Sequence, residues 1–326
     1  GRYTDDLILP NQCHAIFVRS NVAHANISGI DISTALGMPG VRSILTGADY
    51  AASGLGTLMC GWMIHSSDGS EMKTGVHPPL SVDKVRYVGD PVAVVIADTK
   101  QLAKDAAEMV DVSYEELTAI VTPGSVTDTP VHQDIADNVA FNWALGDLGA
   151  TTHAFDEAAN IIEIDLINNR LVPNAMEPRV MNAAYDKRDD RYTLYISSQN
   201  PHGLRMTLAA VIGLAPEHKL RVISEDVGGG FGSKAFNYSE EVIVTWAAKL
   251  VGRPIKWASD RSEAFLTDAH GRDQRVTAAI AFDANNKILG LKASITANMG
   301  AYLSTFGSLI PTYMCAPLLS GQYVIP

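Results

Sequence analysis

Short apolar runs alternate with helical periodicity over the first third of the chain. The runs are rich in Val and Ile and are bounded by turn residues, which predicts strands. They cover residues 13–18, 41–45, 82–88, 92–97 and 110–114. Leu102, Ala106 and Met109 recur at helical spacing, which predicts a helix over residues 100–110, and a shorter helix is expected within residues 30–36. This part of the chain therefore predicts a compact α/β module.

The pattern changes after residue 118. Residues 119–155 hold turn formers and little periodicity, which favours a linker or a long crossover, and residues 51–80 favour a long loop. From residue 156 onward the chain is rich in strand patterns. Strands are expected at residues 161–166, 179–185, 192–197, 220–224, 255–258, 274–282 and 288–298, with helices at 202–212 and 239–251. We therefore expect a mixed α/β (α+β) protein with a domain at 1–118, a linker at 119–155 and a second domain at 156–326.

Composition narrows the classes of function. The length of 326 residues favours two domains, and 47% hydrophobic with 19% charged residues is ordinary globular composition. Lys and Arg number 25 against 36 acidic residues, a net charge of −11, which argues against nucleic acid as a partner. No apolar stretch approaches the roughly 20 residues of a membrane span. Cys13, Cys60 and Cys315 lie far apart, so neither a zinc pattern nor a disulfide framework is expected, and the reducing cytoplasm is the expected location.

Residues 226–234, DVGGGFGSK, carry the sharpest local signal. Four glycines in five positions leave bare backbone that can take positive φ and approach a ligand closely. The loop lies between a predicted strand and a predicted helix, where successive N–H groups can cradle an anion. A purely structural turn that lets strand and helix pack is the simpler alternative.

Two nucleotide-binding interpretations also apply to this loop. A dinucleotide fingerprint G-x-G-x-x-G is met by Gly228 and Gly230 but has Ser233 in its third position, while Asp260 follows roughly where a ribose-binding acid would lie. That interpretation stays open and requires a parallel sheet. A phosphate-binding P-loop requires Gly-Lys-Ser/Thr, which residues 233–235 do not supply.

Several polar side chains near predicted strand ends are further candidates. Gln199 can donate to a ligand oxygen, or it can cap the following helix with the help of Asn200, and capping is the preferred interpretation. Glu177 and Arg179 flank a proline, and we interpret them as members of a structural salt bridge.

The charged stretch at residues 259–273 offers a different kind of candidate. Asp268, His270 and Asp273 could be imagined as metal ligands, but ion pairing explains them better.

Several of these segments, taken in order, resemble one family. The resemblance is to the molybdopterin-binding large subunit of the molybdenum hydroxylases, the xanthine dehydrogenase/aldehyde oxidase/carbon monoxide dehydrogenase family, and it extends over essentially the whole chain. The segments are residues 2–6, 18–25, 39–47, 85–93, 176–179, 198–201, 226–234, 262–273 and 298–302.

The resemblance implies a fold and a cofactor site. The fold is a small hammerhead-like α/β domain followed by the first part of an incomplete molybdopterin-binding domain. The cofactor is molybdenum–molybdopterin, in its plain or its cytosine dinucleotide form, and the pterin rather than a protein side chain holds the metal. In this family the glutamine and the glycine loop lie against the cofactor. The implied cofactor-binding residues are Gln199, Gly229, Gly230, Phe231 and Gly232.

The resemblance also implies an activity and partners. The family hydroxylates N-heteroaromatic compounds or aldehydes with water as the oxygen source, and electrons pass through 2Fe-2S clusters to FAD. Its partners are an iron–sulfur subunit, a FAD subunit, a small-molecule substrate, and the remaining C-terminal molybdopterin domain or a separate subunit that supplies it. Typical xanthine oxidases have a glutamate after the loop lysine, where this chain has Ala235, so a purine substrate is not expected.

Two features limit what this chain does by itself. The family's catalytic glutamate is expected beyond Pro326, and both ends look cut, so no catalytic base is named and the chain alone is expected to be inactive. Two alternatives remain: an NAD-dependent dehydrogenase that uses the loop at residues 228–232, and a non-catalytic assembly module of a multi-subunit oxidoreductase.

Overall fold

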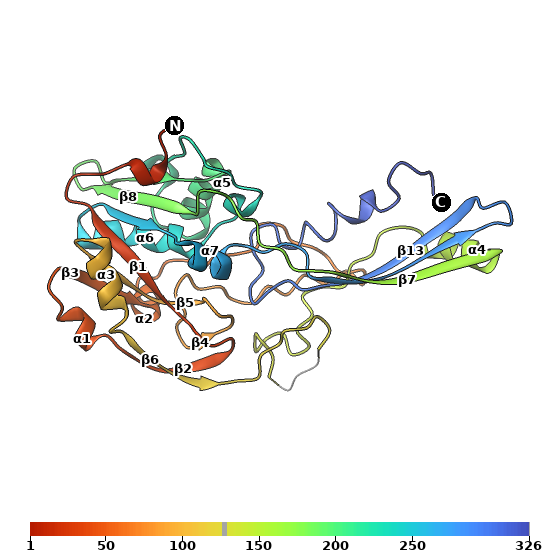
Figure 1. The fold of residues 1–326 in the computed structure, drawn as a ribbon, viewed down its shortest axis with the longest axis horizontal. Coiled ribbons are helices and arrows are strands. Elements are labelled where there is room, and N and C mark those ends of the chain that lie inside the picture. Colours follow the sequence, from red (N-terminus) through yellow and green to blue (C-terminus); the bar gives the residue numbers. More distant parts are fainter. Residues whose placement is uncertain (126–128, 326) are drawn as a thin grey trace. The chain divides into compact units, whose positions relative to one another are not determined.

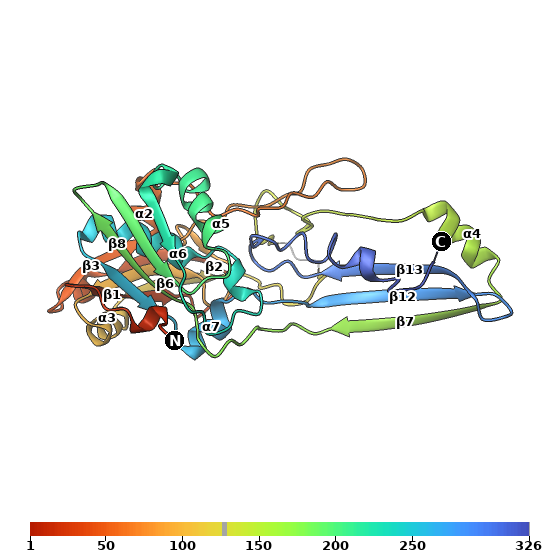
Figure 2. The same ribbon diagram turned by 90° about the horizontal axis from the view of Figure 1, so that it is seen from above.

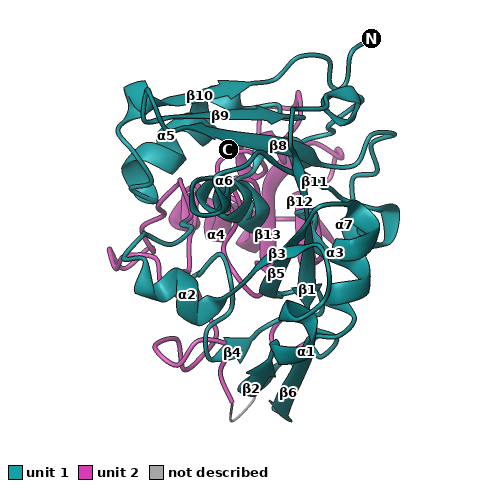
Figure 3. Ribbon diagram, turned by 90° about the vertical axis from the view of Figure 1, so that its left-hand side faces the viewer, with its two compact units in different colours: residues 1–59, 76–119, 172–269 teal, residues 60–75, 120–171, 270–326 magenta. Residues whose placement is uncertain are grey.

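The computed structural model describes residues 1–125 and 129–325, and the chain forms two compact units, each built from several stretches (Figure 3). The first unit contains residues 1–59, 76–119 and 172–269. The second contains residues 60–75, 120–171 and 270–326. Residues 126–128, in the expected linker, and residue 326 lie outside the described part.

A seven-stranded mixed sheet is the centre of the first unit (Figure 1). Only the β10–β9 and β1–β11 neighbours are parallel among its described pairings, and Cys13 of β1 lies beside Ile255 of β11. The sheet therefore joins strands from both sides of the expected linker. In spatial order the strands are β10 (Leu220–Ile223), β9 (Arg191–Ile196), β8 (Val180–Asp186), β11 (Ile255–Ala258), β1 (Cys13–Arg19), β5 (Pro91–Ala97) and β3 (Val41–Thr46).

A smaller sheet and several helices complete the first unit. The sheet has the order β4-β2-β6 and is antiparallel. Its strands are β2 (Ala25–Asp31), β4 (Lys84–Val85) and β6 (Asp111–Glu116). The helices are α1 (Ser33–Leu36), α2 (Gly47–Ala52), α3 (Lys100–Ala107), α5 (Pro201–Met206), α6 (Ser239–Val251) and α7 (Arg261–Thr267). The single helical turns are η1 (Thr4–Asp6), η3 (Glu217–Lys219) and η4 (Ser233–Ala235).

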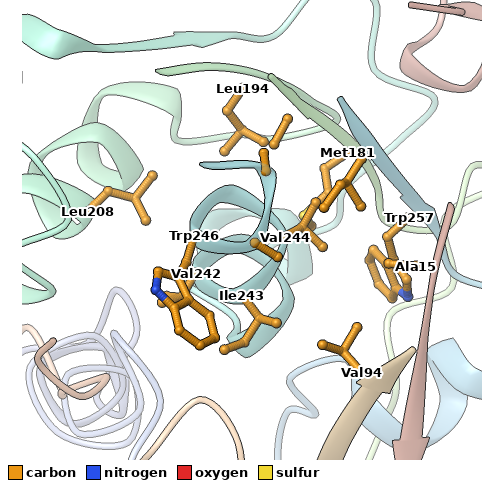
Figure 4. Close-up of a cluster of buried hydrophobic side chains, with 14 of the residues drawn as sticks. Ala15, Val94, Met181, Leu194, Leu208, Val242, Ile243, Val244, Trp246 and Trp257 are labelled. Atoms are coloured by element: carbon orange, nitrogen blue, oxygen red, sulfur yellow. The ribbon is translucent and has the colours of Figure 1, made fainter. Parts of the chain in front are cut away.

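Helix α6 is buried on all sides and organises the main core (Figure 4). Its first ten residues, 239–248, are all buried, as expected of a helix that is apolar around most of its circumference. The ring of Trp246 meets that of Tyr50 edge to face, with centroids 5.3 Å apart. The helix ends at Gly252, whose φ of 67° is the left-handed cap that glycine adopts without strain. The glycine-rich loop therefore leads into a helix whose first ten residues are buried.

The second unit contains a three-stranded antiparallel sheet in the order β13-β12-β7 (Figure 2). Ile162, Ile164 and Leu166 alternate along β7, lie on one face of the sheet and are about half exposed. On the other face, Ala154 of α4 lies close to Gly290. The elements are α4 (Leu148–Asp156), β7 (Asn160–Asn168), β12 (Gln274–Phe282), β13 (Ile288–Ala297) and the turn η5 (Ala316–Leu318).

The mixed α/β class and most of the expected elements are confirmed. The expected ranges of α6, β11 and β12 coincide with the observed bounds. The strand expected at 82–88 was too long, because only Lys84–Val85 pairs with a neighbour. The helix expected at 202–212 is α5 followed by a π-helical turn, η2 (Thr207–Val211).

Helices α2, α4 and α7, strand β2 and most of the single helical turns were not predicted. Helix α4 lies within the expected linker, and its first turn is capped by Asp147, whose carboxylate accepts a hydrogen bond from the backbone N–H of Ala150 at 2.9 Å. Strand β2 was missed because its sequence contains Asn26, Ser28 and Gly29, residues that favour turns. In the part of the chain that the structure describes, no helix has both the length and the apolar character to cross a bilayer.

Candidate functional site

The glycine-rich loop leaves β10 and returns through η4 to the buried helix α6. Gly229 and Gly232 have φ angles of 94° and 90°, and Phe231 between them has 51°. Positive φ explains why glycine occupies two of these positions, and it places Phe231 in a conformation that is unfavourable for an aromatic residue. Phe231 is 76% exposed. The loop is thus held in a strained shape rather than being a relaxed turn.

Three successive backbone N–H groups of the loop have no acceptor among the described residues. They belong to Gly229, Gly230 and Phe231. The N–H groups on either side are engaged: Gly228 donates to the Glu177 carboxylate at 2.8 Å, and Gly232 donates to Gln199 Oε1 at 3.1 Å. Consecutive free N–H groups in a loop of this shape form a cradle for an electron-rich ligand atom.

Gln199 lies directly against this cradle. Its backbone N–H donates to the carbonyl of Lys234 at 2.9 Å, and its side-chain oxygen accepts from Gly232. A Cβ added to Gly230 would approach the Oε1, Cδ and Cγ atoms of Gln199 to less than 3.0 Å, so only glycine fits beside this side chain. The helix cap is made by Asn200, whose Oδ1 accepts from the N–H of Gly203 at 3.1 Å. The preferred capping interpretation of Gln199 was therefore wrong, because Asn200 caps α5 alone.

Glu177 and Arg179 both form salt bridges, but not with each other. Glu177 pairs with Lys234 at 2.8 Å, beneath the glycine loop. Arg179 pairs with Glu240 at 2.8 Å and with Asp268 at 2.6 Å, and all three side chains are almost fully buried. The expected salt bridge between these two residues was therefore wrong, although each of them forms a structural salt bridge of its own. The actual partners were missed, because they are distant in sequence.

Arg179 is the centre of a buried ionic cluster beside the loop. Its guanidinium carbon lies 3.7 Å from the ring centroid of Tyr238, and the Tyr238 hydroxyl donates to the carbonyl of Ser233 at 2.6 Å. Burial by itself would raise the pKa of Glu240, but Arg179 and Arg19 lower it to about 2. The carboxylate therefore stays ionised, and the cluster fixes the end of the loop to α6.

Glu241, the next residue along α6, has the opposite electrostatic behaviour. Burial raises its pKa to about 8, and the hydrogen bond from the N–H of Tyr238, at 3.0 Å, only partly offsets this. Near neutral pH this side chain is mostly protonated and caps the helix as a neutral acid.

The acidic residues considered as metal ligands are paired with arginines. Asp268 pairs with Arg179 in the first unit, and Asp273 pairs with Arg170 at 2.7 Å in the second. Within residues 1–125 and 129–325, no group of three His, Cys, Asp or Glu side chains is arranged to hold a metal ion. Ion pairing therefore accounts for both aspartates.

The dinucleotide-binding interpretation does not fit the observed sheet. A fold of that kind requires a mainly parallel sheet, whereas most neighbours here are antiparallel, and β9 and β8 separate β10 from β11. Asp260, the expected ribose-binding acid, caps α7 by accepting from the N–H of Glu263 at 2.7 Å. The NAD-dependent alternative is therefore not supported.

Comparison with known proteins identifies two matching families. Residues 1–118 match the family described as "Aldehyde oxidase and xanthine dehydrogenase, a/b hammerhead domain". Residues 131–326 match the family described as "Molybdopterin cofactor-binding domain". Together the two matches include nearly all of the chain and contain the whole glycine-rich loop.

Curated relatives and solved structures agree with these matches. The nicotine 6-hydroxylase large subunit of Paenarthrobacter nicotinovorans is 36% identical over 93% of this chain and 36% of its own length. The carbon monoxide dehydrogenase large chain of Hydrogenophaga pseudoflava is 34% identical over 100% of this chain and 41% of its own length. The crystal structure of quinoline 2-oxidoreductase from Pseudomonas putida 86 superimposes with a TM-score of 0.87 at 31% identity, over 100% of this chain and 41% of that one.

The chain thus spans about two fifths of the length of the relatives it matches. Family matches over most of its residues and identities above 30% over nearly its full length agree with the hammerhead and cofactor-binding fold. The chain belongs to the molybdenum hydroxylase family and corresponds to the N-terminal portion of its molybdopterin-binding large subunit.

Proposed function

We propose that this chain forms one wall of the molybdenum–molybdopterin site of a hydroxylase, with Gln199, Gly229, Gly230, Phe231 and Gly232 in contact with the cofactor. The observation that carries this proposal is the row of three N–H groups at residues 229–231, beside the side chain of Gln199, for which the described residues offer no acceptor. The cofactor, when bound, supplies a redox centre that accepts two electrons from a carbon substrate.

The residues present fit such a group. Because Oε1 of Gln199 accepts from Gly232, the amide nitrogen Nε2 is left as a donor, and no described residue accepts from it. Backbone N–H groups and an amide donor stabilise electron-rich oxygen or sulfur atoms without binding a metal themselves. Gly230 keeps the space between loop and glutamine free of any side chain. The role of this chain is therefore to orient the cofactor and stabilise its negative charge.

We further propose an N-heteroaromatic compound or an aldehyde as substrate, with water as the source of the inserted oxygen. Two of the relatives are named nicotine 6-hydroxylase and quinoline 2-oxidoreductase, and nicotine and quinoline are both heteroaromatic compounds. Ala235 follows the loop lysine, and its methyl group cannot hydrogen-bond a purine as a glutamate would. The molybdopterin form, plain or cytosine dinucleotide, is left open in this proposal.

The partners and the organisation of the chain are also proposals. Since the relatives are more than twice as long, we place the catalytic base in the remaining molybdopterin domain, on the same polypeptide or on a separate subunit, and expect this chain alone to be inactive. Iron–sulfur and FAD subunits would carry the electrons away. We propose domains at 1–118 and 156–326 with a linker at 119–155; the match at 1–118 supports the first domain, and the match at 131–326 contains the second. Three free thiols, Cys13, Cys60 and Cys315, support a location in the cytoplasm.

The test is turnover by the complete complex in water enriched in oxygen-18. We expect hydroxylation of a heteroaromatic compound or an aldehyde, with the label in the product and electrons delivered to an artificial acceptor. Purines serve as the comparison class and should react poorly. Turnover that requires NAD⁺, or assembly with iron–sulfur and flavin subunits without any retained molybdenum, would overturn the proposal in favour of a dehydrogenase or an assembly module.

A further inference from the structure

A buried lysine lies beneath the glycine-rich loop. The side chain of Lys234 is only 1% exposed, and its ammonium group donates to Glu177 Oε2 at 2.8 Å and to Ser197 Oγ at 2.7 Å. Burial lowers the pKa of Lys234, and the Glu177 carboxylate opposes that shift. A buried ammonium group with two good partners holds its neighbours in defined positions.

The backbone of the same lysine holds the other side of the site. Its carbonyl accepts from the N–H of Gln199 at 2.9 Å and from the hydroxyl of Ser198 at 3.3 Å. Lys234 therefore contacts the glutamine segment through its main chain and Glu177 through its side chain. These contacts fix where Gln199 leaves the end of β9.

Glu177 in turn holds the first residue of the glycine run. Its Oε2 atom accepts from the N–H of Gly228 at 2.8 Å, as well as from Lys234 and Ser197. Its Oε1 atom is buried and has no partner among the described residues. One oxygen of Glu177 thus accepts three hydrogen bonds while the other accepts none. This arrangement lowers stability, since a buried polar atom without a partner is destabilising.

We propose that Lys234 and Glu177 are positioning residues that join the two ends of the glycine-rich loop and thereby set the spacing between Gln199 and the free N–H groups. Gly228 lies at one end of the loop and Lys234 at the other, so one ion pair closes the segment that carries all three positive φ angles. Strained backbone of this kind persists only where its surroundings over-determine it. The link to cofactor binding rests on the function proposed above, whereas the positioning of the loop by the Lys234–Glu177 ion pair does not.

The test is amide hydrogen exchange, measured by mass spectrometry on this chain without cofactor. The variants are Lys234→Met, the milder Ser197→Ala, and the double variant Lys234→Met/Glu177→Gln, in which no unpaired charge remains. Arg253→Met serves as the control, because Arg253 is a partly buried cation that pairs with Asp98 elsewhere in the same unit.

We expect exchange in peptides that contain residues 197–199 and 228–235 to rise about tenfold or more in both Lys234 variants, since charged hydrogen bonds there are lost. Ser197→Ala should give a smaller rise in the same peptides, and Arg253→Met none. In the double variant the midpoint of denaturation should recover while loop exchange stays fast, because the unpaired charge is gone but the contact is not restored.

Two results would show that the Lys234–Glu177 ion pair does not position the loop. Exchange that rises uniformly over the unit would show a merely structural role, and unchanged loop exchange in the double variant would show that the pair does not position the loop. If Lys234→Met does not fold, the double variant and Ser197→Ala decide the question by the same criteria. In the complete complex the same variants should lose molybdenum and pterin. Fast loop exchange with full cofactor retention would show that the Lys234–Glu177 ion pair positions the loop but has no role in cofactor binding.

Discussion

Gly230→Ala adds a single methyl group at the most crowded point of the site. The new Cβ would lie within 3.0 Å of three side-chain atoms of Gln199, whereas the φ of Gly230 lies outside the left-handed range and is open to alanine. The backbone can therefore accept the substitution, and the clash must be relieved by moving Gln199. The expected structural result is that Gln199 swings away and releases the N–H of Gly232.

The free energies involved predict that Gly230→Ala changes the position of Gln199 without unfolding the chain. Losing the hydrogen bond between Gln199 Oε1 and the Gly232 N–H destabilises the chain by about 1 kcal/mol. Replacing glycine by alanine at a compatible φ stabilises by roughly 0.4–1 kcal/mol through the unfolded chain. The two effects nearly cancel, so the melting temperature should change by no more than roughly 2–4 °C. The expected loss of cofactor binding is not offset, because the amide donor of Gln199 is no longer in place.

The assay is a double-mutant cycle on cofactor retention and loop exchange, with Gly230→Ala, Gln199→Ala and the two combined. Gln199→Ala removes all three atoms that the new methyl group would meet, so Gly230→Ala should have almost no further effect in that background. Additive effects of the two substitutions would show that the methyl group does not act through Gln199. A large drop in melting temperature for Gly230→Ala alone would show the same, because the clash would then involve the backbone.

Three further predictions concern the surroundings of the loop. Arg179→Met should lower the free energy of unfolding by about 3–5 kcal/mol in a denaturant titration, since it leaves the buried Asp268 without its arginine and leaves Glu240 paired with Arg19 alone. The exposed pair of Arg205 supplies the control, and Arg205→Met should cost less than about 1 kcal/mol. Because the folded-state pKa of Glu241 is raised to about 8, its contribution to stability should be complete below about pH 4.5 and should be lost as the pH rises to 8. Glu241→Gln should therefore reduce the dependence of the free energy of unfolding on pH over this range. An unchanged pH dependence would show that the buried Glu241 is not its cause. Phe231→Asn should raise the free energy of unfolding by up to about 1 kcal/mol, because asparagine tolerates the φ of 51°, while turnover of the complete complex falls; a loss of stability would show that the phenyl ring packs against something in the chain.

The secondary structure was predictable where one periodicity acts alone. Strands buried on both faces, such as β5, read as continuous apolar runs, and α6 carries helical spacing together with a glycine cap. The misses occurred where polar residues mask the pattern, as in β2, or where the cap at Asp147 was the main signal for α4. Joining of both halves of the sequence in one sheet could not be read from local patterns, since the β1–β11 pairing spans most of the chain.

The candidate site was predictable only in part, for the same reason. Four glycines in five positions mark a loop with unusual backbone wherever they occur, so residues 228–232 stand out in the sequence alone. The contact of Gln199 with Gly232 joins residues 33 positions apart, and that of Glu177 with Lys234 joins residues 57 apart. No periodicity records such a pairing. The resemblance to a family pointed to Gln199, whereas the interpretation from its residue type favoured a helix cap.

The molybdenum and pterin content of the complete large subunit tests whether the glycine-rich loop and Gln199 hold molybdopterin. We expect one molybdenum and one pterin per subunit in the natural protein. We expect a clear loss of both in Gly230→Ala and Gln199→Ala, with no loss in Arg205→Met. Absence of both from a folded natural subunit, or full retention in both site variants, would show that these residues do not hold the cofactor.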